Sequence, residues 1–420
     1  MTRRIGFGFA FALLVTLTGG CQAVNDNSVN DNNEWRRDTL VPGSPIRSPN
    51  GIEFGPDGKL YAGSVGAKII YRIDVKTREV EIVVPAPLGE ADDLAFAPDG
   101  TLVWTALVAG EIRALREDGT VDVIVPDLPL ANPIHFTKDG RLFAGQIGID
   151  KLYEFTVDEN GNPTGERRLV TSKKGNLNSF EITDDNVLIG PLVDKGMVAK
   201  IDIDTGDVTP IADGLGKIVA VNIDRNGTIW GVDWHSGDLW RIDPADDGWQ
   251  APHKFATLDP PLDNLAIGPD GHVYVSRPAH SSIEKIDTRT GEQTTIIAGQ
   301  FASARGVASF TEAGRDKLLV ADAYGWRIVD VATGEVTAPY DLTEFGFPQG
   351  ATSVAVNDNY FAFADNFLRP RVWLVDRKTG ETVKTWRKIK NPAGISLTED
   401  NTVIVTDGAT GELIRLTNEE

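Results

Sequence analysis

Short stretches in which apolar and polar residues alternate recur along the chain, and tight turns separate them. The segment 50–58 (NGIEFGPDG) returns in similar form at 92–100, 132–140 and 263–271. Weaker copies are centred on the residues that match Phe54, namely Ile182, Ile223, Ser309, Val356 and Leu397. The nine copies follow one another at steps of about 43 residues, which is the length of one four-stranded propeller blade.

Within each copy the order of signals is constant. An alternating strand precedes a Pro-Asp-Gly type turn, in which the aspartate caps the turn and the glycine supplies a positive φ. A second strand, such as 59–62, and a third, such as 69–74, follow, and a Thr-Gly type turn leads into a fourth. No segment keeps a 3.6-residue period, so crossover helices are not expected. The pattern predicts an all-β propeller of four-stranded blades.

The number of copies predicts a nine-bladed ring, with eight blades as the alternative if one weak copy is an appendage. The ninth copy ends after its third strand, near Leu416. Residues 35–41 have strand-like composition, and we expect them to supply the missing fourth strand and so close the ring. Such closure hides edge strands that would otherwise template aggregation. Residues 35–420 are therefore predicted to form a single propeller domain.

The N-terminus carries the features of an export signal. Arg3 and Arg4 precede an apolar stretch, 5–17, that is too short and too interrupted by glycine to span a membrane. The only cysteine, Cys21, follows two glycines, and residues 1–21 resemble a bacterial lipoprotein signal, in which the cysteine becomes the lipidated first residue. Residues 22–34 are predicted to be a flexible tether. We expect a lipid-anchored protein of the cell envelope, outside the cytoplasm; a secreted protein with an incidental cysteine is the alternative.

Composition restricts the partners. Acidic residues outnumber basic ones by 61 to 41, for a net charge of −20. This balance is opposite to that of a duplex-binding protein, so no nucleic-acid partner is expected. The negative net charge also disfavours binding to anionic lipid surfaces, so we expect contact with the membrane only through the lipid anchor. A single cysteine excludes an internal disulfide framework and a Cys-cluster metal site. We expect a monomer.

Asn and Asp gather at one position of the repeat, four residues before the position of Phe54. The residues found there include Asn50, Asp92, Asn132, Asn178 and Asp263. The opening residue of an innermost strand faces the axial channel, so these side chains are expected to follow one arc of it. Carboxylate and amide oxygens suit Ca²⁺, which takes six to eight oxygen ligands. The structural alternative is that they cap the turn that enters the strand.

The openings at 50–52, 92–94 and 132–134, each followed by the hairpin turn, resemble those of the senescence marker protein-30/gluconolactonase superfamily. The resemblance extends over most of residues 46–417, and NHL-type repeats share its hairpin part. The superfamily includes lactonases and organophosphate hydrolases that hold a catalytic calcium at these strand starts. The resemblance implies Ca²⁺ as cofactor, with ligands Asn50, Asp92, Asn132 and Asn178. This sequence departs from the family in two ways. The first ligand of the family is Glu, where this chain has Asn50, and family members are typically six-bladed, whereas nine repeats are present here.

Further candidate residues lie on the same face of the blades. Asp92, Asp263 and the loop residue His235 are candidates to activate water as a general base. Arg277 and His280, in the equivalent loop of the next copy, are candidates to contact a substrate. His135 is expected to pack between blades.

In a nine-bladed ring, Arg305 lies opposite the Asn/Asp arc, where a guanidinium can hold a carboxylate or phosphate through two hydrogen bonds. Pairing of Arg305 with Asp263 is the alternative. The arc and the arginine favour a calcium-dependent hydrolase of lactones, esters or phosphoesters that binds a small anionic or ester-bearing ligand. The missing Glu ligand, the wide ring and the few histidines favour a non-catalytic surface scaffold that binds a protein or glycan.

Overall fold

The computed structural model of the protein describes residues 38–157, 162–337, 351–366 and 370–417. Within them, regular structure consists of β-strands and two short 3₁₀ turns, η1 (Val193–Lys195) and η2 (Pro278–His280). In this described part, no helix has the length and apolar character needed to cross a membrane. The expected signal segment, Cys21 and the tether lie outside the described residues. The all-β prediction is confirmed.

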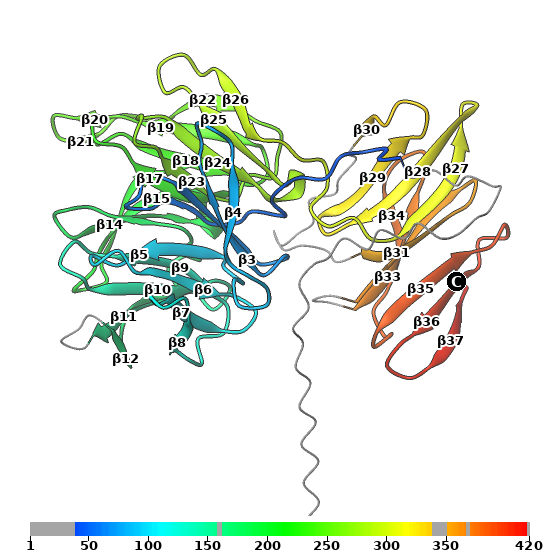
Figure 1. Ribbon diagram of the computed structural model, residues 1–420, viewed down its shortest axis with the longest axis horizontal. Coiled ribbons are helices and arrows are strands. Elements are labelled where there is room, and N and C mark those ends of the chain that lie inside the picture. The colour runs from blue at the N-terminus through cyan, green and yellow to red at the C-terminus, as the bar shows by residue number, and fades with distance from the viewer. Residues whose placement is uncertain (1–37, 158–161, 338–350, 367–369, 418–420) are drawn as a thin grey trace, which may run out of the picture. The chain divides into compact units, whose positions relative to one another are not determined.

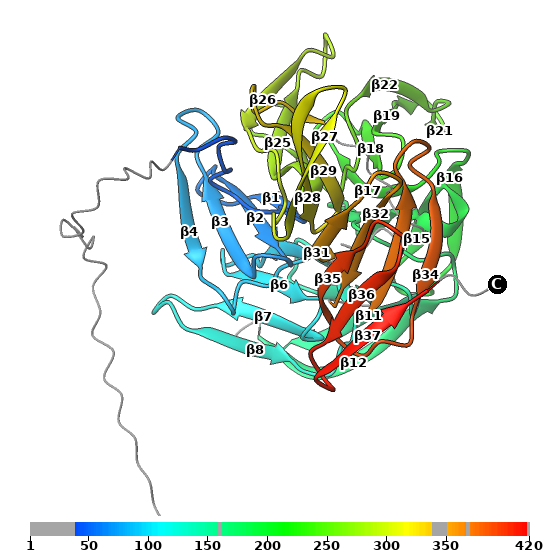
Figure 2. The same ribbon diagram turned by 90° about the vertical axis from the view of Figure 1, so that its right-hand side faces the viewer.

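Six antiparallel four-stranded sheets follow one another along the first two thirds of the chain. The first three contain β1 (Ile52–Phe54), β2 (Leu60–Ser64), β3 (Ile69–Ile73) and β4 (Val80–Val84); β5 (Asp93–Phe96), β6 (Leu102–Ala106), β7 (Glu111–Leu115) and β8 (Val121–Val125); and β9 (Ala131–Phe136), β10 (Leu142–Gln146), β11 (Lys151–Val157) and β12 (Pro163–Ser172). Figure 2 shows β1 to β4 side by side in sequence order.

The next three sheets repeat this order. They contain β13 (Glu181–Ile182), β14 (Val187–Leu192), β15 (Met197–Asp202) and β16 (Val208–Ala212); β17 (Ile218–Ile223), β18 (Ile229–Asp233), β19 (Asp238–Ile242) and β22 (His253–Thr257); and β23 (Leu265–Ile267), β24 (Val273–Arg277), β25 (Ser282–Ile286) and β26 (Gln293–Ile297). A small hairpin of β20 (Pro244–Ala245) and β21 (Gly248–Trp249) is inserted before β22.

The Pro-Asp-Gly turns form the hairpins that the sequence predicts. Phe54 pairs with Leu60 and Ile52 with Ala62, so the turn between β1 and β2 closes directly after the alternating strand. Gly58 adopts φ +74° there, in the left-handed region that favours glycine, and its amide donates to the carbonyl of Gly55. The equivalent Gly271 adopts φ +77° in the sixth sheet.

The six sheets close into a ring, because β1 of the first sheet lies against β23 of the sixth. The two sheets share one apolar core: Ile52, Leu60, Ala62 and Tyr71 from the first, with Ala266, Tyr274 and Ile283 from the sixth. The rings of Phe54 and Tyr274 meet edge to face with centroids 5.1 Å apart. The expected nine-bladed ring, and the eight-bladed alternative, are therefore corrected to a ring of six sheets.

Three further sheets, which we call the extension, stack in series after the ring (Figure 1, yellow to red). They contain β27 (Val307–Glu312), β28 (Arg315–Asp322), β29 (Gly325–Asp330) and β30 (Val336–Thr337); β31 (Ala351–Val356), β32 (Tyr360–Asp365), β33 (Arg371–Asp376) and β34 (Thr382–Trp386); and β35 (Pro392–Leu397), β36 (Val403–Asp407) and β37 (Glu412–Leu416).

The ring does not use an N-terminal strand. Residues 38–41, the described part of the predicted closing strand, are not in a β-strand, and the last sheet has three strands in the described part of the chain. Each of the six ring sheets already has four strands from contiguous sequence, so closure requires no exchange between the chain ends. Residues Leu40–Glu420 form one compact unit that holds both the ring and the extension.

Candidate functional site

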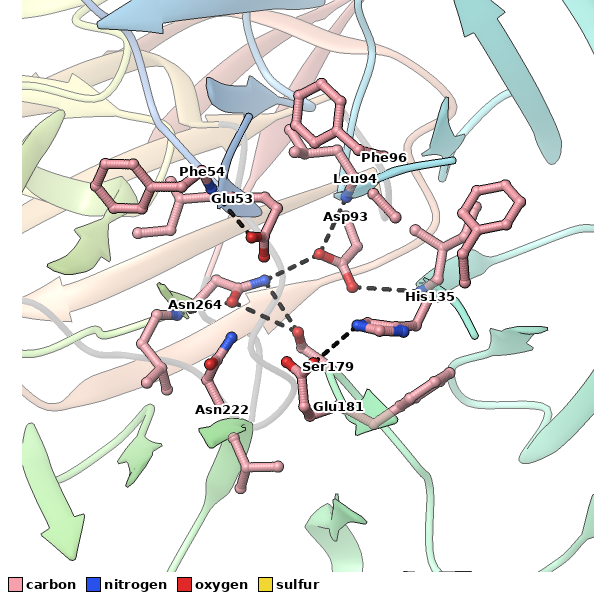
Figure 3. Close-up of a pocket in the computed structure, with 17 residues that line it drawn as sticks. Glu53, Phe54, Asp93, Leu94, Phe96, His135, Ser179, Glu181, Asn222 and Asn264 are labelled. Atoms are coloured by element: carbon pink, nitrogen blue, oxygen red, sulfur yellow. Dashed lines mark hydrogen bonds and ion pairs between the residues drawn. The ribbon is translucent and has the colours of Figure 1, made fainter. Parts of the chain in front are cut away.

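A cavity of about 140 Å³ lies where the innermost strands of the ring converge (Figure 3). Each of the six sheets contributes at least one polar side chain to its lining: Glu53, Asp93, His135, Ser179 with Glu181, Asn222 and Asn264. These residues stand one or three positions before the position of Phe54 in their repeats. Because side chains alternate along a strand, these positions share one face, and that face is turned to the axis.

An ion pair crosses the cavity between the third and fourth sheets. The Nε2 atom of His135 lies 3.0 Å from a carboxylate oxygen of Glu181. Burial alone would lower the pKa of His135, but the carboxylates of Glu181 and Glu53 outweigh it and raise the pKa to about 9. His135 is therefore a positive charge inside the ring at neutral pH, and its role extends beyond the inter-blade packing that the sequence predicts.

The two remaining carboxyl groups of the cavity hold protons near neutrality. Burial, followed by the nearby charge of Glu181, raises the pKa of Glu53 to about 8. Burial also raises the pKa of Asp93, to about 7, although hydrogen bonds from the amides of Ile134 (3.3 Å) and Leu94 (3.0 Å) oppose the shift. Charge at the axis thus changes across the neutral pH range.

A second group of polar residues, the mouth cluster, consists of Asn50, Asp92 and Asp263 from the first, second and sixth repeats. The Nδ2 atom of Asn50 donates to Oδ2 of Asp263 over 2.7 Å, which joins the two ends of the ring. Burial and the charge of Asp263 raise the pKa of Asp92 well above its usual range, and burial raises the pKa of Asp263 to about 6. Among the described residues, neither carboxylate forms an ion pair with a basic side chain.

The mouth cluster fits a divalent cation. Two partly buried carboxyl groups that repel each other suit Ca²⁺, as does the amide oxygen of Asn50, which also accepts a hydrogen bond from the amide of Val65 over 3.1 Å. Burial and then the charge of Asp263 raise the pKa of Asp92, and a cation would relieve the second of these effects. The fit needs oxygens besides those of acidic residues, because the described part of the chain contains no group of three or more His, Cys, Asp or Glu side chains placed to hold a metal.

The other two ligands implied by the resemblance, Asn132 and Asn178, are buried at strand starts of the third and fourth sheets. The Oδ1 atom of Asn178 accepts from the amide of Ser179 over 2.9 Å, as the capping alternative expects. The backbone carbonyl of Asn132 accepts from Thr105 Oγ1 over 2.6 Å. The hydrogen bonds of the structure join neither side chain to the mouth cluster, so their role as ligands stays a prediction.

Three predicted site residues, His235, Arg277 and His280, lie at the ends of inner hairpins of the fifth and sixth sheets. His235 is exposed, and its amide donates to Asp233 Oδ1 over 2.7 Å, so Asp233 caps this loop. Arg277 forms ion pairs with Glu284 at 3.1 Å and Asp259 at 3.4 Å. Burial, then the positive charges of Arg277 and Arg327, lower the pKa of His280 to about 3, which keeps the imidazole neutral.

Arg305 is not part of the ring. It is an exposed residue that precedes β27, the first strand of the extension. Its Nε lies 3.5 Å from Ser303 Oγ. The placement of Arg305 opposite the Asn/Asp arc assumed a nine-bladed ring, and closure after six sheets removes that geometry.

No family model matches the chain. A gluconolactonase from Zymomonas mobilis subsp. mobilis is 26% identical over 158 residues, which are 32% of this chain and 44% of that relative. The matched part thus spans less than half of the length of the relative.

Solved structures with similar folds include virginiamycin B lyase from Staphylococcus aureus (17% identity, 66% of this chain and 92% of that chain, TM-score 0.47). Another is regucalcin, a calcium-binding protein from Agrobacterium tumefaciens (16% identity, 62% of this chain and 96% of that chain, TM-score 0.46). A third is the gluconolactonase XC5397 from Xanthomonas campestris (18% identity, 55% of this chain and 81% of that chain, TM-score 0.41). Over the 158 matched residues the chain is a homologue of gluconolactonase, in agreement with the superfamily resemblance that its repeats indicate.

Proposed function

We propose that the protein is a lactonase-type hydrolase that acts at the mouth cluster. Its sequence similarity to a gluconolactonase supports the reaction class. The observation that carries the proposal is the pair of partly buried, mutually interacting carboxyl groups of Asp92 and Asp263, with Asn50 donating a hydrogen bond to Asp263. A buried carboxylate whose pKa lies near the working pH is suited to proton transfer.

Asp263 is the general base of the proposed reaction. Its pKa of about 6 leaves it ionised at neutral pH, and the hydrogen bond from Asn50 orients the carboxylate. Asp263 accepts a proton from water as the water oxygen bonds to the lactone carbonyl carbon. It then returns this proton to the ring oxygen as the carbon–oxygen bond breaks, which yields a hydroxy acid.

Ca²⁺, when bound, would supply Lewis-acid polarisation of the carbonyl. Asn50 and Asp92 would hold it, together with Asn132 and Asn178 if the resemblance extends to them. Asp92 serves this role better than that of a base, because its pKa lies well above the usual range until a cation stabilises the carboxylate.

The test uses the purified protein with a set of uncharged lactones and esters, in the presence of calcium and after chelation. Asp263→Asn is expected to lower kcat by about 100-fold or more, as loss of a general base does. Asp184→Asn, which alters an exposed carboxylate, is the matched control. A parent protein that hydrolyses none of these compounds, yet binds a protein or glycan, would replace the enzyme with the scaffold alternative.

Export and anchoring through Cys21 are also part of the proposal. They rest on the sequence of residues 1–21 and place the hydrolase in the cell envelope, outside the cytoplasm.

A further inference from the structure

Three large apolar side chains, which we call the apolar rim, are exposed in loops that flank the second sheet. Leu88, between β4 and β5, is 43% exposed; Val108, between β6 and β7, is 49% exposed; and Leu130, between β8 and β9, is 37% exposed. The other large apolar side chains of comparable exposure in the described part of the ring lie singly on outermost strands: Ile82, Val123 and Leu169. Single apolar residues are normal on a protein surface, whereas a group of them marks a contact site.

Hydrogen bonds join the loop of Leu88 to the turn of Val108. Glu90 is buried, and one oxygen of its carboxylate accepts from the amides of Val108 (2.7 Å) and Ala109 (2.9 Å). The guanidinium of Arg113, on β7, donates to the carbonyl of Leu88 over 2.9 Å. Two buried side chains therefore hold Leu88 and Val108 on neighbouring loops.

The turn of Val108 also packs against the loop of Leu130. The amide of Leu128 donates to the carbonyl of Gly110 over 2.7 Å. Gly110 adopts φ +70°, and a Cβ atom there would lie only 3.1 Å from Cα of Pro129, so glycine permits the close approach of the two loops. The three side chains of the apolar rim thus come from adjacent loops whose backbones are fixed to one another.

The apolar rim adjoins the mouth cluster at Asp92, the residue that the second repeat supplies. The amide of Asp92 donates to the carbonyl of Thr105 over 3.0 Å, so Asp92 stands beside the end of β6. Val108 follows Thr105 in the sequence by only a few residues, which span at most about 11 Å of chain. Leu88 lies in the loop that leads directly to Asp92. A molecule with its reactive group at Asp92 can therefore extend over the rim.

The extension packs against loops of the same kind and leaves the rim exposed. Arg327 donates to the carbonyl of Ala279, between β24 and β25 of the sixth sheet, over 2.7 Å. The ring of Tyr324 lies 6.2 Å, centroid to centroid, from that of Trp234, between β18 and β19 of the fifth sheet. In their sheets, these loops are the equivalents of the turn between β6 and β7. The rim is exposed with the extension in place, so a ligand can reach it.

We propose that the apolar rim binds the hydrocarbon chain of the substrate, and that the hydrolase acts on lactones and esters that carry an alkyl chain. The inference rests on the proposed function and adds the class of substrate to it. Contact with Leu88, Val108 and Leu130 removes apolar surface of both partners from water, so the gain in binding grows with each methylene of the chain.

The charges beside the rim favour an uncharged chain over an anionic partner. Nζ of Lys68 lies 2.9 Å from a carboxylate oxygen of Glu90, and Nη2 of Arg113 lies 2.6 Å from one of Glu111. Because a carboxylate neutralises each of these two cations, they offer no net positive charge to a phosphate group or to an anionic lipid surface. An alkyl chain requires no such charge, and a phospholipid surface is the less favoured occupant.

Two lactones that differ only in their alkyl chain test the proposal. δ-Hexanolactone carries a methyl group and δ-decanolactone a pentyl group on the same ring carbon. On an open surface we expect about half of the free energy of full burial, or about twofold in kcat/KM for each methylene. The parent should therefore have a kcat/KM about 15-fold higher for δ-decanolactone than for δ-hexanolactone.

The double variant Val108→Ser/Leu130→Ser is expected to reduce this ratio to about threefold or less, because it removes most of the apolar surface of the rim. Val123→Ser is the matched control and should keep the ratio of the parent. Val123 belongs to the same sheet and is 49% exposed, as Val108 is, but it lies on the outermost strand β8. Both lactones report on the same folded molecules, so the ratio does not depend on how much of a variant folds.

An active parent with equal kcat/KM for the two lactones overturns the role of the apolar rim alone. A ratio that the double variant leaves unchanged also overturns it. If the double variant then lowers co-sedimentation with phosphatidylcholine vesicles, measured in the Cys21→Ser chain so that no lipid anchor contributes, the rim contacts a membrane instead. A parent without activity on any lactone or ester overturns the proposed function and this inference together.

Discussion

Replacement of Glu53 by glutamine should remove a pH-dependent loss of stability from the ring. Glu53 faces the cavity from the first sheet, with Glu181 and His135 across from it and Asp93 beside it. Its pKa of about 8 in the folded protein lies far above the 4.5 of an ordinary glutamate. The folded state therefore binds a proton that the unfolded chain has already released between these two values. The contribution of Glu53 to the free energy of unfolding is therefore fully present below pH 4.5, and it is lost as the pH rises from there through 8.

The size of this effect follows from the shift. Each pH unit between 4.5 and 8 costs about 1.4 kcal/mol of unfolding free energy, so the full shift corresponds to at most about 5 kcal/mol. Glu53 is only partly buried, and water in the cavity screens its charge, so we expect about 1 to 3 kcal/mol to be measured. Glutamine keeps the shape and has no charge to bury. Glu181 remains as the partner of His135.

Urea unfolding at pH 5 and pH 8 measures the difference. Glu53→Gln and the parent should be equally stable at pH 5, and the variant should be more stable at pH 8. Glu117→Gln, a change at an exposed residue in a turn of the second sheet, is the control and should match the parent at both values. If Glu53→Gln lowers stability equally at both values, or if the parent is as stable at pH 8 as at pH 5, the charge of Glu53 is not the cause.

Two further predictions concern the metal and the anchor. Calcium at 100 times its dissociation constant should stabilise the parent by about 2.7 kcal/mol, seen as a higher thermal midpoint that chelation reverses and Asp92→Ala abolishes; a midpoint that responds to calcium in neither protein contradicts the site. Cys21→Ser should move the protein out of the membrane fraction, because it removes the only thiol available for lipidation; an unchanged distribution between membrane and soluble fractions contradicts the lipoprotein signal.

The repeats predicted each sheet, but they did not predict how many sheets close the ring. Leu413 in the ninth repeat pairs with Thr406 as Ile283 in the sixth pairs with Ser276, so the two residues hold the same position. Ile283 is fully buried against the first sheet, whereas Leu413 is 72% exposed. Both repeats carry an apolar residue suited to the face between blades. The local sequence of a repeat therefore does not reveal that six twisted sheets are enough to close the ring.

The sequence also located the mouth cluster better than the cavity. Asn50, Asp92 and Asp263 stand out because they recur at one position of the repeat, and the structure brings them together. The cavity residues Glu53 and Glu181 hold the same position of the repeat, but the other ring repeats place Ala95, His135, Asn222 and Ala266 there, so recurrence marks that position only weakly. The alternation of side chains along the strand would have found them, because the residues one and three positions before that of Phe54 both face the axis.

Tyr324 shows a different limit. It is more than 270 positions away from Ser48 in the sequence, and it belongs to a repeat that contributes no strand to the ring. Its approach to Ser48 depends on closure after the sixth sheet, because a nine-bladed ring would make its sheet one wall of the channel. Early closure instead frees the seventh sheet to place the loop between β28 and β29 against Ser48, and Arg327 of β29 against the carbonyl of Ala279. The surplus repeats therefore pack against the ring without adding a strand to it.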